Sequence, residues 1–369
     1  MAPKIKIAYI MPSMAGGGAE RFLLDLLQTI DRGRFAPLVI LFKEAGQWHE
    51  ELEKLNLPIF VLSKKSKISL SNCWQIYKIL KKEKPEIVHT QLGGDLRGRL
   101  AAKLAGVKVI ISTEQNINRQ ERWYQRATKI ITSLWTEVVV AISPAVAKDM
   151  RRRYFLPLKK CELVIPNGIP LEKFEYQEKR PNSGIINVGA VGRLNKQKGF
   201  DILIEAWSKI KAENTRLMIA GEGEEREILQ KQINKSGLSE QISLIGNVKD
   251  MPAFYQSLNL LVMPSRWEGL GIAALEAGAC GVPVVASAVD GLGDIINENT
   301  GWSLVPNDSQ ELAKILQETL SQLNSEVTKI KQAKLRTLIV EKYSINQVTV
   351  SYEDLYLKLW RQNYENIAS

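Results

Sequence analysis

The chain has 369 residues, enough for two domains of ordinary size, and its 45% hydrophobic and 24% charged residues are typical of a soluble globular protein. No uninterrupted apolar run approaches the roughly 18 residues of a membrane-spanning helix, so the sequence predicts no such span. The net charge of +10 is concentrated in residues 1–180, which hold 31 Lys and Arg against 18 Asp and Glu. This surplus indicates a first half that faces phosphates, an acidic membrane surface or nucleic acid.

The first half of the chain alternates between strand and helix patterns. Predicted strands cover residues 4–11, 36–42, 58–62, 86–89, 108–112, 138–142 and 163–165, and predicted helices cover residues 20–30, 48–55, 72–82, 96–105 and 146–154. This alternation predicts βαβ units and a parallel, doubly wound sheet. Residues 116–135 interrupt it with a helix or helix pair rich in Arg, Trp and Tyr, and residues 166–170 are predicted to form a turn.

The same architecture restarts in the second half. Predicted strands follow at 185–191, 215–220, 241–245, 258–263 and 283–287, with helices at 200–210 and 272–279 among them. We therefore predict an α/β protein with a first domain over residues 1–170, a linker over 171–183, a second domain over 184–344, and a C-terminal helical segment over 345–369 that packs back on the first domain. Two such domains predict a ligand cleft between them, at the carboxyl ends of their strands.

The cysteines and histidines are few. Cys73, Cys161 and Cys280 are far apart and show no metal-binding or redox spacing, so we expect reduced thiols in a cytoplasmic protein. Because only two histidines occur, His49 and His89, a histidine-built metal centre is not expected.

One stretch of the second domain combines a strand, a glycine turn and a helix. Glu268 lies in the turn, and Glu276 follows eight positions later in the helix. The backbone N–H groups at such a helix start favour an anionic ligand, and a carboxylate in the turn can accept hydrogen bonds from hydroxyls. The combination suits a sugar nucleotide. The alternative is a surface charge and a helix salt-bridge partner.

Two further loops carry phosphate-binding signals. Gly17 and Gly18 open a helix directly after the first strand, where the missing side chains let backbone N–H groups approach a phosphate. Arg193 and Lys198 lie in the loop after the first strand of the second domain, where they can neutralise a diphosphate, Arg as a fork of donors and Lys as a point charge. The alternatives are a tight turn and two solvated cations.

These motifs, in this order, resemble those of the retaining glycosyltransferases of family 4, which have the GT-B fold of two Rossmann-like domains facing across a cleft. The resemblance covers residues 17–21, 165–169, 192–206, 268–276 and 279–286. It implies transfer of a hexose-type sugar from a nucleotide-diphosphate sugar, with a UDP-sugar favoured and with retention at the anomeric carbon. It also implies that no metal or other cofactor is needed.

The resemblance assigns roles to residues. Glu268, Arg193 and Lys198 are the implied catalytic residues, which bind sugar hydroxyls and stabilise the departing diphosphate. The implied donor-binding residues are Gly17, Gly18, Leu270, Gly271, Ile272 and Glu276, the last through the ribose.

The first domain departs from the family pattern. Many relatives have a histidine after the strand at 108–112, and Gln115 stands in that place here. A glutamine can donate a hydrogen bond but cannot become cationic or take a proton. His89, Asp95 and Glu114 are therefore further candidates for the acceptor side.

The acceptor is expected to be a glycan or a lipid-linked molecule of cell-envelope or polysaccharide synthesis. Lys64, Lys65 and Lys67, together with the basic and aromatic residues of 119–135, suit a lipid headgroup interface. They predict docking on the anionic inner face of the plasma membrane. A soluble basic face is the alternative.

Three other functions compete with this one. A sugar-nucleotide epimerase of related fold would need an acid/base set that the sequence lacks, and a catalytically silent scaffold would not need the charged loop residues. A nucleic-acid-binding protein would account for the sequence pI of about 9.3, but no recognition helix or base-stacking module is recognisable, so no nucleic-acid partner is expected.

Overall fold

The computed structural model describes residues 4–15, 17–62, 69–117, 123–154, 163–176, 184–211 and 213–365. The chain divides into two compact units. Unit 1 comprises Met1–Gly168 with Ile345–Ser369, and unit 2 comprises Ile169–Ser344. The lysine loop at 64–67, the basic residues Arg119 and Arg122, Cys161 and part of the expected linker, 177–183, lie outside the described residues.

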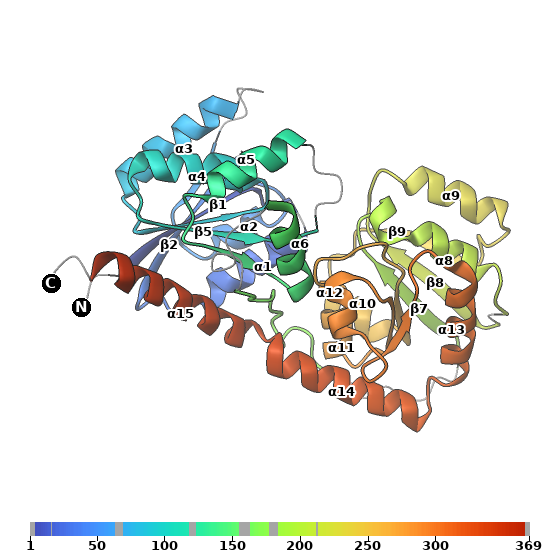
Figure 1. Ribbon diagram of the computed structural model, residues 1–369. Helices are drawn as coiled ribbons and strands as arrows, with labels where there is room; N and C mark the ends of the chain where they lie inside the picture. Colours follow the sequence, from blue (N-terminus) through green and yellow to red (C-terminus); the bar gives the residue numbers. More distant parts are fainter. Residues whose placement is uncertain are drawn as a thin grey trace. The chain divides into compact units, whose positions relative to one another are not determined.

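Unit 1 is built on a six-stranded parallel sheet (Figure 1). The strands are β1 (Ile5–Ser13), β2 (Phe35–Glu44), β3 (Ile59–Val61), β4 (Ile87–Gln91), β5 (Val109–Glu114) and β6 (Val138–Ala141), in the order β3-β2-β1-β4-β5-β6. The helices are α1 (Gly18–Thr29), α2 (His49–Glu53), α3 (Ser69–Glu83), η1 (Leu92–Gly94), α4 (Asp95–Ala105), α5 (Trp123–Ser133), α6 (Pro144–Tyr154) and α15 (Ile345–Tyr364).

Unit 2 repeats this topology. Its strands are β7 (Ile186–Val191), β8 (Thr215–Ala220), β9 (Ile242–Gly246), β10 (Leu260–Met263), β11 (Val284–Ser287) and β12 (Trp302–Leu304), in the order β12-β11-β10-β7-β8-β9. The helices are η2 (Lys196–Lys198), α8 (Phe200–Trp207), α9 (Arg226–Lys235), α10 (Met251–Ser257), α11 (Ile272–Ala279), α12 (Asp290–Ile295), α13 (Ser309–Ser321) and α14 (Glu326–Lys342). Both sheets have the Rossmann strand order, which confirms the predicted fold class.

Helices cover both faces of each sheet, so the central strands are buried on both sides. In β1, alternate residues enter two different cores: Tyr9 packs with α1 and α15, whereas Ala8 and Ile10 pack with α3 and α4. A strand covered on both faces is almost continuously apolar, and β1 shows that pattern. In unit 2, α8, α9 and α13 share one core with the sheet, and α11 packs with α14 (Figure 1).

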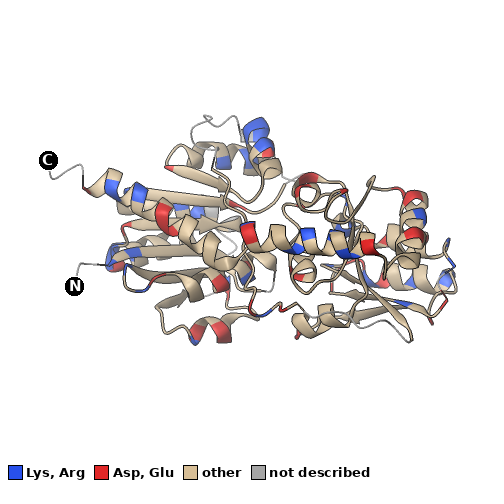
Figure 2. Ribbon diagram, turned by 90° about the horizontal axis from the view of Figure 1, so that it is seen from below, with Lys and Arg blue, Asp and Glu red and all other residues tan. Residues whose placement is uncertain are grey.

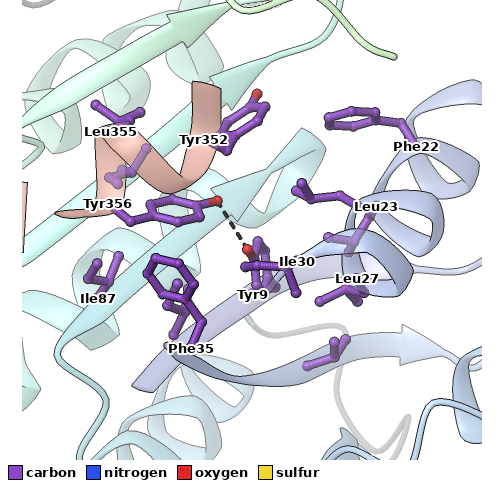
Figure 3. Packing of buried hydrophobic residues seen from close by; sticks show 14 of the residues in the cluster. Tyr9, Phe22, Leu23, Leu27, Ile30, Phe35, Ile87, Tyr352, Leu355 and Tyr356 are labelled. Carbon is purple, nitrogen blue, oxygen red and sulfur yellow. Dashed lines mark hydrogen bonds between the residues drawn. The ribbon is translucent and has the colours of Figure 1, made fainter. Parts of the chain in front are cut away.

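The C-terminal helix α15 completes the core of unit 1. Tyr352 and Tyr356 are fully buried against α1 and the sheet, and the Tyr9 hydroxyl donates to the Tyr356 hydroxyl over 3.1 Å (Figure 3). At the C-terminal end of α1, the hydroxyl of Thr29 shares a 2.5 Å hydrogen bond with the hydroxyl of Thr349 in α15. A segment that is distant in sequence thus supplies several large side chains to the first hydrophobic core.

Two local expectations were wrong. Residues 163–165 form only an isolated bridge, Ala141 to Val164, because β6 itself ends at Ala141 and offers no further residue of a strand to pair with. Residues 166–170 do not form a turn; instead the Ile169 N–H donates to the Tyr343 carbonyl over 2.8 Å. The predictions also gave no bounds for β12, α9, α10, α12, α13 or α14.

Candidate active site

Two loops leave neighbouring strands of unit 2 at the point where the strand order reverses. β7 and β10 are hydrogen-bonded neighbours, although they are far apart in sequence. The loop after β7 runs from 192 to 199 and carries Arg193 and Lys198, and the loop after β10 runs from 264 to 271 and carries Glu268. The reversal point of a doubly wound sheet is where such folds bind ligands.

Glycines allow these two loops to approach each other closely. Gly199 has φ +65° and caps the start of α8, and a Cβ atom there would overlap the Pro264 carbonyl oxygen. Gly271 has φ +92° at the start of α11. Both backbone conformations are open to glycine and strained for other residues. The glycines that mark these loops in the sequence are therefore required by the geometry.

Hydrogen bonds fix one loop against the other. The Arg266 N–H donates to the Gln197 carbonyl over 2.8 Å, and Gln197 Nε2 donates to the Trp267 carbonyl over 3.1 Å. The Arg266 guanidinium also holds Asp201 with two bonds of 2.7 and 2.8 Å. Bidentate pairs of this kind fix orientation as well as distance. None of these residues was predicted for the site, yet together they hold its backbone in place.

The loops meet at an ion pair between two predicted residues. Lys198 Nζ lies 2.5 Å from Glu268 Oε2, and Ser265 Oγ lies 3.4 Å from the same oxygen. The aliphatic part of Lys198 packs over Gly192, where a Cβ would crowd it. Glu268 is 8% exposed, so its carboxylate depends on these partners. The structure therefore brings a cation and a carboxylate to one point.

Arg193 offers a second cation in the same loop. Its side chain is exposed and, within the described part of the chain, has no hydrogen-bond or ion-pair partner. An exposed guanidinium beside a glycine loop is available to an anionic ligand.

The α11 helix carries the remaining predicted donor-binding residues. Leu270, Gly271 and Ile272 lie at its start, where the first backbone N–H groups have no acceptor within the helix. Glu276 is partly exposed, and its Oε2 accepts a 2.8 Å hydrogen bond from the hydroxyl of Tyr255 in α10. Burial, and then the adjacent Glu276 charge, raises the pKa of Tyr255, so this hydroxyl remains a donor. No motif in the sequence indicated the Tyr255 contact.

In unit 1, the predicted phosphate-approach glycines lie at the start of α1. Gly17 caps the helix and Gly18 is its first residue, which is exposed. The backbone N–H groups of this first helical turn have no acceptor within the helix. The third glycine of the triplet, Gly16, lies outside the described residues.

His89 lies inside the core of unit 1. Its Nδ1 is 2.8 Å from the Tyr356 hydroxyl and its Nε2 is 2.7 Å from Thr113 Oγ1. The ring is fully buried, and this burial lowers the pKa of His89 to about 3. A neutral imidazole that is buried and hydrogen-bonded to two hydroxyls is typical of a structural histidine in a protein core.

The other acceptor-side candidates bind different partners and do not form one cluster of contacts among the described residues. Glu114 accepts a 2.9 Å bond from Lys129 of α5, whereas Gln115 Oε1 accepts a 2.7 Å bond from Asn167 Nδ2. Asp95 is the first residue of α4, and its side chain lies outside the described atoms. Gln115 lies at the carboxyl end of the sheet. Among the described residues, its Nε2 and the Oδ1 of Asn167 have no hydrogen-bond partner.

Two Rossmann-like units in one chain define the GT-B fold, and similar solved structures share it. A glycosyltransferase from Rickettsia africae is 22% identical with a TM-score of 0.83, covering 96% of this chain and 98% of that one. Anabaena HepE in complex with UDP and glucose is 20% identical with a TM-score of 0.85, covering 96% and 100%.

Family models identify the family more closely. The model described as Glycosyltransferase Family 4 matches residues 16–173, and the model described as Glycosyl transferases group 1 matches residues 173–336. Together they span residues 16 to 336. The chain belongs to the family 4 glycosyltransferases, as its motifs predicted, and is therefore an enzyme of sugar transfer.

Curated relatives agree with this assignment. The UDP-Gal:alpha-D-GlcNAc-diphosphoundecaprenol alpha-1,3-galactosyltransferase of Escherichia coli is 28% identical over 96% of this chain and 97% of its own length. The lipopolysaccharide core biosynthesis mannosyltransferase LpsB of Rhizobium meliloti is 35% identical, but over only 42% of this chain and 44% of its own length.

Proposed function

We propose that this enzyme transfers a hexose from a UDP-sugar to a lipid-linked glycan acceptor in cell-envelope or polysaccharide synthesis, with retention at the anomeric carbon. The observation that carries the proposal is the Lys198–Glu268 ion pair at the strand-order reversal of unit 2. The choice of donor and acceptor is supported by the name of the Escherichia coli relative, which matches nearly the whole chain.

The proposed chemistry divides between charge and hydroxyl recognition. Arg193 and Lys198 stabilise the negative charge that develops on the departing diphosphate. Glu268 accepts hydrogen bonds from the sugar hydroxyls, with the backbone N–H groups of 270–272, and Glu276 binds the ribose. Gly17 and Gly18 bring backbone N–H groups to the phosphates. Because the Glu268 carboxylate is already held by Lys198 at 2.5 Å, we assign it hydroxyl binding and no covalent nucleophilic role.

We propose that transfer needs no metal, because two cations already serve the phosphates. In the described residues, no group of three or more His, Cys, Asp or Glu is placed to hold a metal ion. Transfer should persist in excess EDTA. Activity lost in EDTA and restored by Mg²⁺ or Mn²⁺ would contradict this part of the proposal.

The donor is tested by ligand-dependent thermal stability. Millimolar UDP and UDP-hexose should raise the melting temperature, while GDP, ADP and their sugars should not, because a ligand stabilises the state that binds it. The Lys198→Met variant should lose most of the shift. Transfer is then measured with UDP-galactose and a polyprenyl-diphosphate-linked N-acetylglucosamine. A protein that no nucleotide or nucleotide sugar stabilises would refute the proposed function.

A peripheral membrane contact is the second part of the proposal. The helices on one face of the unit 1 sheet expose large apolar side chains: Trp74 of α3, Leu104 of α4, and Trp123 and Ile131 of α5, with Trp123 81% exposed. Basic residues flank them, and Lys78 Nζ lies 5.6 Å from the centre of the Trp74 ring. Apolar rings among cations suit an anionic headgroup region. No helix of the described residues is long and apolar enough to cross a bilayer.

Liposome sedimentation tests this contact. The protein should pellet with vesicles containing anionic phospholipid at low salt, and Trp123→Ser should weaken pelleting severalfold. Val327→Ser is the control, because Val327 is also exposed but belongs to α14 of unit 2, which carries both signs of charge (Figure 2). Binding that does not depend on anionic lipid, or equal losses in both variants, would remove the membrane contact from the proposal.

A further inference from the structure

Buried amide groups without hydrogen-bond partners gather at the carboxyl end of the unit 1 sheet. Gln91 ends β4 and is 1% exposed, and among the described residues neither its Nε2 nor its Oε1 has a hydrogen-bond partner. Gln115 uses its Oε1 to bind Asn167, but in the same described part of the chain its Nε2 has no partner, and neither has Asn167 Oδ1. Native proteins leave few buried polar atoms unpaired, so four in one region of the fold need an explanation.

The sheet register places Gln91 and Gln115 on one face. Gln91 is paired with Thr113 on the neighbouring strand, and Gln115 lies two residues beyond Thr113. Because side chains alternate along a strand, both glutamines belong to the face of Thr113 and His89, which α15 covers. Glu114 belongs to the opposite face, where it binds Lys129.

The polar groups deeper on this face are paired. His89 has partners at both ring nitrogens, and Tyr356 binds both His89 and Tyr9. Among the described residues of this face, Trp360 Nε1 on α15 also lacks a partner, but the four unpaired amide atoms lie where the strands end, beside the β1–β4 reversal of the strand order. That is the position at which a doubly wound sheet receives a ligand.

The backbone next to Gln91 supports the same conclusion. Leu92 follows Gln91 directly and has φ +54°, a left-handed conformation that is strained for leucine. Strain of this kind is concentrated at functional sites. Since no hydrogen bond holds the Gln91 amide, its side chain can rotate toward a ligand without breaking one.

We propose that Gln91, with Gln115 and Asn167, forms a neutral amide subsite that binds the hydroxyl or acetamido groups of a sugar ring. This inference rests on the proposed function. Amides both donate and accept hydrogen bonds, as sugar hydroxyls do, and they carry no charge that would select a phosphate. The sugar belongs either to the donor or to the acceptor, and kinetics distinguish the two.

The test uses Gln91→Met, which keeps the length of the side chain and removes its polar atoms. Its melting temperature should be equal to or above that of the wild type, because unpaired buried amide atoms are removed, while kcat/KM should fall at least tenfold. A rise in the acceptor KM assigns the acceptor sugar. A rise in the donor KM, with slower donor hydrolysis in the absence of acceptor, assigns the donor sugar. Gln75→Met, on α3, is the control and should leave both KM values unchanged.

Two outcomes separate this inference from the proposed function. A wild type without turnover refutes the proposed function, and saturation-transfer NMR with free galactose and N-acetylglucosamine then tests the subsite by binding alone. Signals that are weaker in Gln91→Met than in the wild type support the subsite. Equal kcat/KM values in an active enzyme, or equal NMR signals in an inactive one, would overturn it. If Gln91→Met fails to fold, Gln115→Met is compared in the same two assays, with the same criteria.

Discussion

The two units share one strand order but end their sheets with different chemistry. At the reversal point of unit 2, the loops carry an ion pair, Lys198 with Glu268, and the exposed Arg193. At the corresponding point of unit 1, the buried polar groups are the uncharged amides of Gln91, Gln115 and Asn167. Topology therefore fixes where ligand-binding groups converge, and the side chains in the loops fix which ligand chemistry they can serve.

The difference follows the needs of a sugar-nucleotide reaction. A departing diphosphate gains negative charge and needs cations in fixed positions. A neutral sugar ring needs donors and acceptors without charge. The unit 2 loops are held by backbone bonds and the Arg266–Asp201 pair, and Lys198 is held by its ion pair with Glu268, so this cation is positioned before a ligand arrives. In unit 1, both polar atoms of the Gln91 amide, Gln115 Nε2 and Asn167 Oδ1 have no partner among the described residues, and so these atoms can bind a ligand.

The largest effect should come from removing the cation at the unit 2 reversal point. Lys198→Met leaves the partly buried Glu268 carboxylate without its cation and removes a stabiliser of the leaving group. We expect kcat to fall about 10²- to 10³-fold, equivalent to about 2.7–4 kcal/mol of transition-state stabilisation. Steady-state transfer kinetics and a thermal melt should show this loss in a folded protein.

Lys196→Met provides the matched control. Lys196 belongs to the same short helix, η2, but its side chain is exposed, and its known contact to Arg266 uses only the backbone carbonyl. Its rate should stay within about twofold of the wild type by the reasoning for exposed charges. Equal losses in the two variants would mean that general positive charge, and not the ion pair, distinguishes unit 2 from unit 1.

The next effect tests whether water is excluded from the unit 1 core around His89. His89 has a folded-state pKa of about 3, against roughly 6.5 when unfolded, so between these values only the unfolded chain binds the proton. Stability is therefore lost as pH falls. Between pH 7 and 4.5, His89 should account for a loss of about 2–3 kcal/mol in the free energy of unfolding.

Denaturant unfolding of the wild type and His89→Gln at both pH values measures this contribution. The variant should be less stable at pH 7 by about 1–3 kcal/mol, because the hydroxyls of Tyr356 and Thr113 lose well-placed partners. Its further loss on acidification should be smaller than that of the wild type. His49→Gln, the variant of the only other histidine in the sequence, should lose as much stability as the wild type. Identical pH dependence in wild type and His89→Gln would show that the core beneath the amides admits water.

The sequence predicted the elements with strong local signals. The bounds of α11 agree with the predicted helix because Gly271 marks its start, and α15 lies within the predicted C-terminal segment because an amphipathic pattern extends through it. β12 was not predicted because it has only three residues and carries no alternation. α13 begins at an Asp308 cap, which accepts bonds from two backbone N–H groups, a signal that was present in the sequence but not used.

Contacts between distant segments could not be predicted in the same way. Lys198 and Glu268 were both recognised by motif, but their 2.5 Å contact joins residues 70 positions apart through the β7–β10 pairing. The role of His89 depends on Tyr356, 267 positions away on α15. Gln91 carries no motif; its lack of a partner among the described residues and the left-handed backbone of Leu92 beside it draw attention to it.

The smallest effect concerns how unit 2 holds its second carboxylate. Tyr255→Phe removes the hydroxyl that donates to Glu276 over 2.8 Å and leaves the ring packing unchanged. If Glu276 binds the ribose, the donor KM should rise about tenfold, near 1.5 kcal/mol for a hydrogen bond to a charged group, while kcat changes little. Tyr343→Phe, a change at another buried tyrosine of unit 2, should leave the donor KM unaltered. A Tyr255→Phe enzyme with an unchanged KM would show that Glu276 needs no positioning, and the fixed geometry of unit 2 would then be confined to the Lys198–Glu268 loops.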